Sequence, residues 1–281
     1  MSDTPLRITS PAKLNLSLRL LGKREDGFHE IDTLMTPVPG LCDELTFTPA
    51  KSFSFTCDVP SIPDDDTNLV VKATKLFEKL SKKKCKAAVH LTKVIPHGAG
   101  LGGGSSNAAA TLRAWNSLHN DVLSEEKLHA AAAELGSDVP FFLGTTTARC
   151  SGRGEVITPV PALPSMPIVI LKPAFAVATV DAYSRTANPV EIAGINYDPV
   201  AFPWGEVVND LEKAVFSKFI YLAELKKWLY SRPEVAAAGM SGSGSAMFAI
   251  LKKPDLGENL ILQVRERVDP SLWTWSGSIG G

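Results

Sequence analysis

Leucines and polar residues alternate strictly near the start of the chain. Every even position from 14 to 20 is leucine, and the odd positions between them are polar. A period of two is typical of a strand with one buried face, so we predict a strand over residues 12–22. Lys13 and Asn15 would then project together from the face that points away from the core.

Segments with strand-like and helix-like patterns follow one another through the next hundred residues. Residues 64–82 combine an acidic start with apolar residues at helical spacing, and a second helical segment begins at the N-cap residue Ser124 and ends at Gly136. The predicted strands are 28–38, 43–50, 53–59 and 85–95, and the predicted helices are 64–82, 105–118 and 123–136.

A proline-dense stretch from Pro159 to Pro167 marks a predicted domain boundary. It divides the chain into residues 1–160 and 161–281. Beyond it we predict a buried strand over 168–179 and a helical stretch over 209–230. Early strands, then helices, then a second mixed half indicate an α+β fold.

Composition and charge narrow the class of protein. The formal net charge of −1 argues against a protein whose main task is binding nucleic acid. No apolar run approaches the roughly 20 residues that span a membrane, and the first residues lack the core of a signal peptide. Cys42, Cys57, Cys85 and Cys150 are scattered without CxxC pairs. This favours a cytoplasmic protein with reduced thiols and no zinc site.

The most distinctive segment is PHGAGLGGGSSNAAA, residues 96–110, where glycines run into alanines. Bare N–H groups at the start of a helix bind anions such as phosphate. A P-loop is excluded, because no lysine follows these glycines. The Rossmann pattern at Gly98, Gly100 and Gly103 lacks the strand that should follow its helix. A phosphate-binding loop remains, with a tight packing loop that binds no ligand as the alternative.

This segment resembles the second signature of the GHMP kinases, whose loop wraps the triphosphate of ATP ahead of a helix. SPAKLNLSLRLLGKREDGFHEIDTL resembles the N-terminal signature of that family, and AAAGMSGSGSAMFAI resembles the C-terminal one. The three matches lie in the order of the family. The resemblance implies a ribosomal protein S5 domain 2-like N-terminal domain, a ferredoxin-like C-terminal domain, and ATP-dependent phosphorylation of a small alcohol.

The segments AKLNL, DGFH, GLGGGSSNAA and GSDVPFF are similar to one branch of the family. That branch phosphorylates the 2-hydroxyl of 4-diphosphocytidyl-2-C-methyl-D-erythritol. The resemblance therefore implies this molecule and ATP as partners, with no nucleic acid or membrane. Two alternatives stay open: a GHMP kinase of the homoserine or mevalonate type, and a noncatalytic RNA-binding module, because the S5-like fold also serves in nucleic-acid proteins.

The resemblance assigns the glycine loop to ATP. Loop N–H groups and the helix dipole would supply part of the positive charge that phosphoryl transfer needs. Gly102, Gly103 and Gly104 would be glycines because a Cβ holds phosphates away, or because φ is positive. Asn68 and Lys93 match positions beside the adenosine. The implied loop residues are Pro96, His97, Gly98, Ala99, Gly100, Leu101, Gly102, Gly103, Gly104, Ser105, Ser106 and Asn107.

Asp138 and Lys13 are the implied catalytic pair. Asp138 stands in GSDVP, where the family has its general base, and Lys13 would lie close to both Asp138 and the acceptor oxygen. A neighbouring ammonium favours the ionised carboxylate, which would then orient the hydroxyl or accept its proton. The alternatives are an Asp138 that caps a short helical turn and a Lys13 exposed on its strand.

Phe28 and His29 match a pair of positions that hold cytosine in the resembling kinases, by ring stacking and by edge hydrogen bonds. Tyrosine is usual at the first position, so Phe28 keeps the ring but lacks the hydroxyl. Tyr183 matches the second face of the stack, and core packing is the alternative for both aromatics. The other implied substrate-binding residues are Asn15, Asp138, Thr179, Gly242 and Ser243, where a plain strand-to-helix turn is the alternative for the last two.

Mg²⁺ is implied by ATP, but the sequence offers no clear ligand set. Other branches of the family place a glutamate about eleven residues before the catalytic aspartate, and that position here is Lys127. Ser106 or the nucleotide itself would then hold the metal ion.

Overall fold

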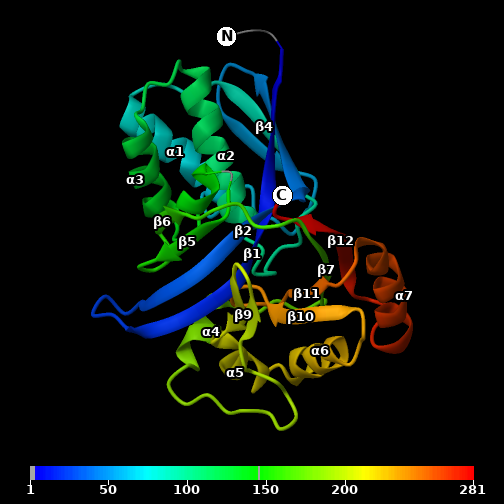
Figure 1. Ribbon diagram of the computed structural model, residues 1–281. Coiled ribbons are helices and arrows are strands. Elements are labelled where there is room, and N and C mark those ends of the chain that lie inside the picture. Colours follow the sequence, from blue (N-terminus) through cyan, green and yellow to red (C-terminus); the bar gives the residue numbers. More distant parts are fainter. Residues whose placement is uncertain (1–3, 145) are drawn as a thin grey trace.

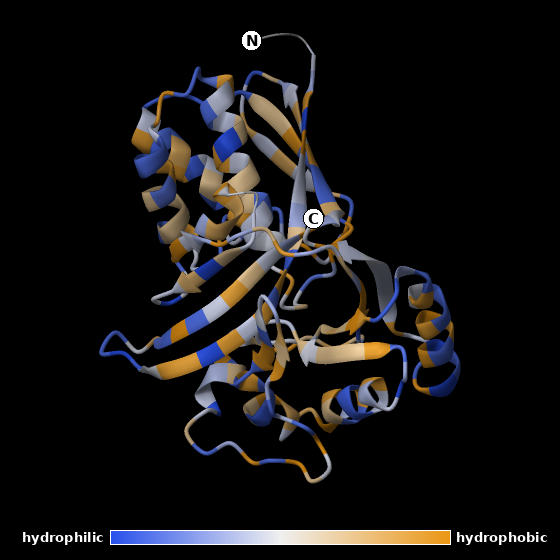
Figure 2. Ribbon diagram, in the orientation of Figure 1, coloured by the Kyte–Doolittle hydropathy of each residue, from blue (hydrophilic) through white to orange (hydrophobic). Residues whose placement is uncertain are grey.

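The predicted alternating segment forms part of a long hairpin. The structure, a computed structural model, describes residues 4–144 and 146–281. Strand β1 (Leu6–Lys23) pairs antiparallel with β2 (His29–Pro49), from Lys23 opposite His29 to Leu6 opposite Phe47. The tip of this hairpin is hydrophilic and extends beyond the rest of the molecule (Figures 1 and 2).

Strand β2 joins two segments that the sequence predicts as separate strands. Pro11 pairs with Cys42 and the next residue, Ala12, pairs with Val38. Residues 39–41 of β2 therefore have no partner on β1 and form a bulge. The proline and glycine of this bulge interrupt the hydrophobic pattern without ending the strand. The prediction of a break in this region is therefore wrong.

Three helices cover one face of the first sheet (Figure 1). Their apolar sides form a core with the sheet, in which the fully buried rings of Phe47 and Trp115 meet edge to face at 5.3 Å. Within the described residues the sheet runs β3-β4-β2-β1-β9-β8, with β5 paired to β2 and β6 paired to β5. The other elements of the first half of the chain are β3 (Ser54–Cys57), α1 (Leu69–Ser81), β4 (Ala87–Thr92), α2 (Gly103–Leu118), α3 (Glu125–Leu135), the 3₁₀ turn η1 (Pro140–Leu143), β5 (Ala148–Ser151) and β6 (Val156–Pro159).

A second, antiparallel sheet has the order β10-β11-β7-β12. The predicted strand over 168–179 ends early, at Lys172, because Pro173 cannot continue the ladder. The predicted helical stretch over 209–230 is two helices, interrupted at residues 217–219. The elements of this half are β7 (Met166–Lys172), α4 (Thr179–Ser184), β8 (Val200–Phe202), β9 (Gly205–Asn209), α5 (Leu211–Phe216), α6 (Ile220–Tyr230), β10 (Val235–Met240), β11 (Met247–Leu251), η2 (Pro254–Leu256), α7 (Gly257–Arg267) and β12 (Trp273–Ile279).

The two halves of the chain interlock. Strand β9 comes from the second half but pairs in parallel with β1, with Leu18 opposite Asn209. Leu14 and Leu16 of β1 share a hydrophobic core with residues of the second sheet such as Ile170 and Phe248. Strand β1 therefore lies where the two sheets meet, and the division at residue 160 stays a prediction.

Candidate active site

The glycine-rich segment forms a loop that passes directly into helix α2. The helix begins at Gly103, two residues before the predicted start, and Gly102 is its N-cap with φ of 70°. Backbone N–H groups from 98 to 102 donate no hydrogen bond to another described residue. Together with the first turn of α2, they leave a row of donors available to an anion.

Close packing explains some of these glycines better than phosphate contact does. A Cβ on Gly100, where φ is +75°, would lie 2.1 Å from the carbonyl oxygen of Ser241. Of the three glycines from 102 to 104, only Gly102 has a positive φ. A Cβ on Gly103 would meet the Lys93 ammonium at 2.9 Å, whereas Gly104 is exposed and a Cβ there would touch only a methyl group at 3.6 Å. Of the three, Gly104 alone has neither a positive φ nor a close packing contact that requires glycine, and neither it nor Gly103 lines the larger cavity described below.

The carbonyl oxygen of Gly100 is the centre of a junction between three distant segments. It accepts hydrogen bonds from Lys13 Nζ at 2.9 Å and from Ser241 Oγ at 3.0 Å. Lys13 also donates to Asn15 Oδ1, and the Asn15 amide donates to Thr33 Oγ1 at 2.8 Å. Strand β1, the glycine loop and the serine-rich loop at 241–245 are thereby held together.

Lys13 and Asn15 are buried, contrary to the expectation that they project away from a core. Their exposed fractions are 2% and 4%. The loop at 241–245 covers their face of β1, and Ser241 Oγ accepts a hydrogen bond from the Asn15 N–H at 3.3 Å. The alternative of an exposed strand lysine is therefore wrong.

Asp138 lies beside Lys13, in the turn between α3 and η1. One carboxylate oxygen is 3.5 Å from Lys13 Nζ, and about a third of the side chain is exposed. Neither α3 nor η1 uses Asp138 as a side-chain cap, so the capping alternative has no support in this geometry. The carboxylate also acts on its surroundings: burial, followed by the charge of Asp138, raises the pKa of the Cys150 thiol to about 12.

A cavity of about 930 Å³ extends from this pair along β1 to the turn that joins β1 and β2. Its volume is in the range of small-molecule sites. The predicted site residues that line it are Lys13, Asn15, Phe28, His29, Gly98, Gly100, Gly102, Asp138, Thr179, Tyr183, Gly242 and Ser243.

Aromatic and basic side chains form the end of the cavity away from the glycine loop. The rings of His29 and Tyr183 lie 5.2 Å apart and are tilted by 41°, and His29 Nε2 contacts Thr186 Oγ1 at 3.2 Å. Burial, with a smaller effect of the Asp138 charge, raises the pKa of Tyr183. Phe28 is half exposed and carries the Arg153 guanidinium 4.7 Å from its ring centre.

The loop at 241–245 closes the cavity from the second half of the chain. Thr179 Oγ1 and Ser243 Oγ are 3.1 Å apart, so α4 is tied to this loop. Gly242 has a φ of +56°, and a Cβ there would lie 3.1 Å from Asn15 Oδ1.

Other predicted residues have their side chains engaged outside the cavity. Asn68 is the N-cap of α1 and accepts from the Val70 N–H at 2.8 Å. The Lys93 ammonium pairs with the buried Asp43 at 2.6 Å, and the Asn107 amide donates to the same carboxylate at 3.0 Å.

Further loop residues act through the backbone or face elsewhere. The carbonyl of Ala99 accepts from the Ala246 N–H, and that of Leu101 accepts from the Lys13 N–H. The Ser106 hydroxyl is enclosed and has no hydrogen-bond partner among the described residues. Ser106 lines a second cavity, of about 480 Å³, that does not include Lys13 or Asp138. Pro96, His97 and Ser105 do not line the larger cavity either.

Ser241, Arg153 and Thr33 are among the residues of this site that were not predicted. Ser241 stands one position before the glycine and serine of the predicted loop, so the repeated serines of SGSGS were a usable signal. Arg153 follows the glycine of a turn, and Thr33 lies on β2 opposite Leu18. Only the fold brings these last two to the site.

The fold, the glycine loop and the order of the three motifs define a GHMP kinase. The model of the GHMP kinases N terminal domain matches residues 68–145, and the GHMP kinases C terminal model matches residues 199–269. A crystal structure of homoserine kinase from Cytophaga hutchinsonii superimposes with a TM-score of 0.70 at 18% identity, covering 100% of this chain and 95% of that one, which supports the fold alone.

Relatives with higher sequence identity indicate the branch of the GHMP kinases. The chain is 42% identical to 4-diphosphocytidyl-2-C-methyl-D-erythritol kinase of Methylacidiphilum infernorum, over 94% of this chain and 93% of that protein. The chloroplastic enzyme of Arabidopsis thaliana is 38% identical over 87% of this chain and 67% of its own. A crystal structure of 4-(cytidine 5'-diphospho)-2C-methyl-D-erythritol kinase gives a TM-score of 0.80 at 32% identity, covering 98% and 100% of the two chains. The chain belongs to this family of GHMP kinases.

The predicted kinase and its two-domain fold are thus confirmed, and the noncatalytic RNA-binding alternative is wrong. No helix in the described part of the chain has the length and hydrophobicity to cross a membrane.

Proposed function

We propose that this kinase transfers the γ-phosphoryl group of ATP to the 2-hydroxyl of 4-diphosphocytidyl-2-C-methyl-D-erythritol, giving the 2-phosphate and ADP. The observation that carries the proposal is the arrangement of the larger cavity. It has the Lys13–Asp138 pair beside the glycine loop at one end and aromatic and basic side chains at the other. An elongated acceptor would place its hydroxyl at the Lys13–Asp138 end of the cavity and its nucleobase at the aromatic end.

The triphosphate of ATP binds at the loop from Gly98 to Gly104 in this proposal. The unpaired N–H groups of the loop and the first turn of α2 hold its oxygens, and the helix dipole adds positive potential. Preorganised donors of this kind are each worth about 3 kcal/mol to a transition state.

Asp138 receives the acceptor hydroxyl. Its partly exposed carboxylate can accept a hydrogen bond from the hydroxyl, orient the oxygen toward phosphorus and take up its proton as the new O–P bond forms. Lys13 contributes a fixed positive charge, because its other contacts are the neutral oxygens of Gly100 and Asn15. That charge stabilises the carboxylate and the negative charge of the transferring group.

The cytidyl end of the acceptor lies against Phe28, His29 and Tyr183. The half-exposed ring of Phe28 offers a face for base stacking, and the His29 imidazole offers an edge hydrogen bond. Lys23 and Arg153 line the same part of the cavity and can neutralise the diphosphate.

Mg²⁺ fits this site as an ion carried by the nucleotide. Asp138 is the one carboxylate among the described residues that line the cavity, and it is already paired with Lys13. No cluster of three or more potential metal-ligating side chains occurs in the described chain. Mg²⁺ commonly keeps several waters and binds substrate phosphates, and when bound it neutralises phosphate charge. Ser106 lines the second cavity, which does not include Lys13 or Asp138, so the proposal does not use its hydroxyl as a ligand.

A coupled ADP-release assay tests the proposal. The purified protein is given ATP with the cytidyl substrate, homoserine or mevalonate, and phosphorus NMR locates the new phosphate. We expect turnover with the cytidyl substrate and a phosphate on the 2-hydroxyl. Phosphorylation of homoserine or mevalonate in preference to it would overturn the proposed substrate and leave the kinase class intact.

A further inference from the structure

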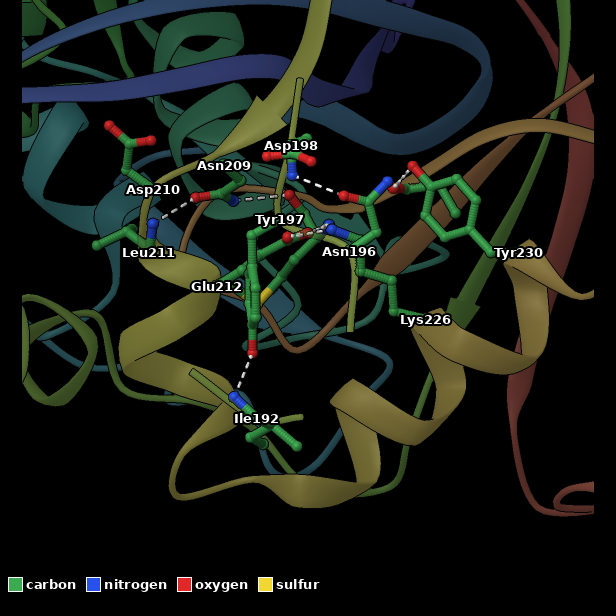
Figure 3. A network of polar contacts seen from close by, with 12 residues as sticks. Ile192, Asn196, Tyr197, Asp198, Asn209, Asp210, Leu211, Glu212, Lys226 and Tyr230 are labelled. Carbon is green, nitrogen blue, oxygen red and sulfur yellow. Dashed lines mark hydrogen bonds and ion pairs between the residues drawn. The ribbon is translucent and has the colours of Figure 1, made fainter. Parts of the chain in front are cut away.

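The side chain of Asn209 supports the loop at 241–245 from the side opposite the cavity. Its amide nitrogen donates to the carbonyl oxygens of Met240 and Gly242, both at 2.7 Å, and its Oδ1 accepts from the Leu211 N–H at 2.9 Å. Asn209 is 5% exposed. Every one of these bonds is to main chain, so the amide determines the path of the loop and the start of α5 together (Figure 3).

Asn209 also belongs to the sheet that carries Lys13. It is the last residue of β9 and lies opposite Leu18 of β1, the strand that contains Lys13 and Asn15. One residue therefore links the position of β1 to the position of the loop that covers it.

A buried ion pair holds the adjacent peptide. Glu212 accepts a hydrogen bond from the Met240 N–H at 2.9 Å and pairs with Lys226 Nζ at 2.5 Å (Figure 3). Both charged side chains are at least nine-tenths buried, and burial raises the pKa of Glu212. Because a buried ion pair is weak as a source of net stability, its geometric effect on Met240 is the more informative property.

The loop packs closely against Lys13 and Asn15 at the point that faces the cavity. A Cβ on Gly242 would lie 3.1 Å from Asn15 Oδ1 and 3.3 Å from Lys13 Nζ. The carbonyl of this same residue is the one that Asn209 holds. A shift of about 1 Å at a reacting group can lower the rate about 10²-fold.

We propose that Asn209 is a positioning residue for phosphoryl transfer. It fixes the Gly242 peptide against Lys13 and Asn15, while the Glu212–Lys226 pair fixes the neighbouring Met240 N–H. The proposal deepens the proposed function and rests on its placement of the reaction at Lys13 and Asp138. It requires no particular acceptor.

The test compares Asn209→Ala with Asn116→Ala. Asn116 is a matched control, because it is equally buried and its amide bridges the backbone N–H and carbonyl of Leu123, away from the cavity. Both variants should lower Tm to a comparable extent. Only Asn209→Ala should lower kcat, by about 10-fold to 10²-fold, with KM for ATP changed less than about 3-fold.

Asn209→Asp provides a readout that a purely structural role would not move. The carboxylate keeps the acceptor for the Leu211 N–H but cannot donate to Met240 or Gly242 until it is protonated. The ratio of its kcat to that of the wild type should therefore rise as pH is lowered from 8 to 6. A ratio that does not depend on pH, together with an unchanged kcat for Asn209→Ala, would overturn the proposal.

Two further measurements keep the test decisive. If neither Asn209 variant folds, Gly242→Ala probes the same contact from the loop, and a kcat equal to that of the wild type would contradict the proposal. If the wild type rejects the cytidyl substrate, the same ratios are measured with whichever acceptor it phosphorylates. Failure of the proposed substrate and failure of the positioning role are then separate results.

Discussion

The ammonium of Lys13 and the carboxylate of Asp138 are 3.5 Å apart although strand β1 and the turn after α3 are far apart in the chain. Lys13 is nearly inaccessible to solvent, whereas a third of the Asp138 side chain is exposed. The lysine is thus a fixed part of the cavity wall, and the carboxylate is the partner that a substrate can reach.

Replacement of Asp138 by asparagine should lower kcat by roughly 10² to 10⁴, the effect of losing a general base. The side chain keeps its size, so Tm should change little. Steady-state kinetics measure kcat and thermal melting curves measure Tm for the variant and the wild type. Glu134→Gln removes a nearby carboxylate that does not line the cavity, and it should keep kcat. A normal kcat for Asp138→Asn would show that the carboxylate has no part in the chemistry.

Substitution of Gly104 should weaken ATP binding without disturbing the loop. A Cβ there meets only one methyl group, at 3.6 Å, and otherwise points outward. We expect Gly104→Val to raise KM for ATP by about 10-fold or more while Tm stays within a few degrees of the wild type. Gly103→Val is the contrasting variant, because its Cβ would collide with Lys93 and Ile95 and should also lower Tm. Unchanged KM for Gly104→Val would place the phosphates elsewhere.

Phe28→Ala should raise KM for the cytidyl substrate about 10-fold, since base stacking on an aromatic ring is worth about 1–3 kcal/mol. The ring is half exposed, so the variant should keep its Tm and its KM for ATP. Loss of Tm with equal effects on both substrates would assign Phe28 to packing.

His29→Ala should reduce the preference for a cytidyl over a uridyl acceptor. Stacking tolerates any base, so discrimination requires a hydrogen bond to the base edge, and the His29 imidazole faces the cavity. The ratio of kcat/KM for the two acceptors measures this preference. An unchanged ratio would transfer the role to backbone groups.

Thiol reactivity should separate the four cysteines into two pairs. Burial raises the pKa of Cys85 and Cys150 to about 12, so neither forms much thiolate at pH 8. Cys42 and Cys57 are partly exposed and should react with Ellman's reagent, more slowly than free cysteine because their pKa is also raised. Two thiols should react in the folded protein and four in denaturant. Early labelling of Cys150, detected by peptide mapping, would contradict this order.

Local sequence patterns were sufficient to predict the helices and strands that have their own capping residues and hydrophobic periodicity. Helix α3 begins after Ser124, whose side chain accepts from the Lys127 N–H, and it ends at Leu135 before Gly136. Gly136 has an extended backbone rather than the left-handed one expected of a C′ glycine. The break at 217–219 could not be predicted, because no glycine or proline marks it and the helices on both sides contribute to one core.

Motifs in the sequence select candidate site residues, but tertiary contacts decide what surrounds each of them. Lys13 stands in such a motif, yet its burial depends on the loop at 241–245, more than two hundred residues away. Asn68 and Lys93 have the polar groups of ligand-binding residues, yet a helix cap and a buried carboxylate engage them. A motif indicates which residue types are present, and only the fold determines what each of them contacts.

The pairing of β9 with β1 restricts how the enzyme can open. A strand of the second half is hydrogen-bonded into the sheet of the first half, beside the strand that carries Lys13. The two halves therefore cannot swing apart about a hinge as two separate lobes without breaking this sheet. Any opening that keeps this pairing leaves β1, with Lys13, and β9 in place relative to each other.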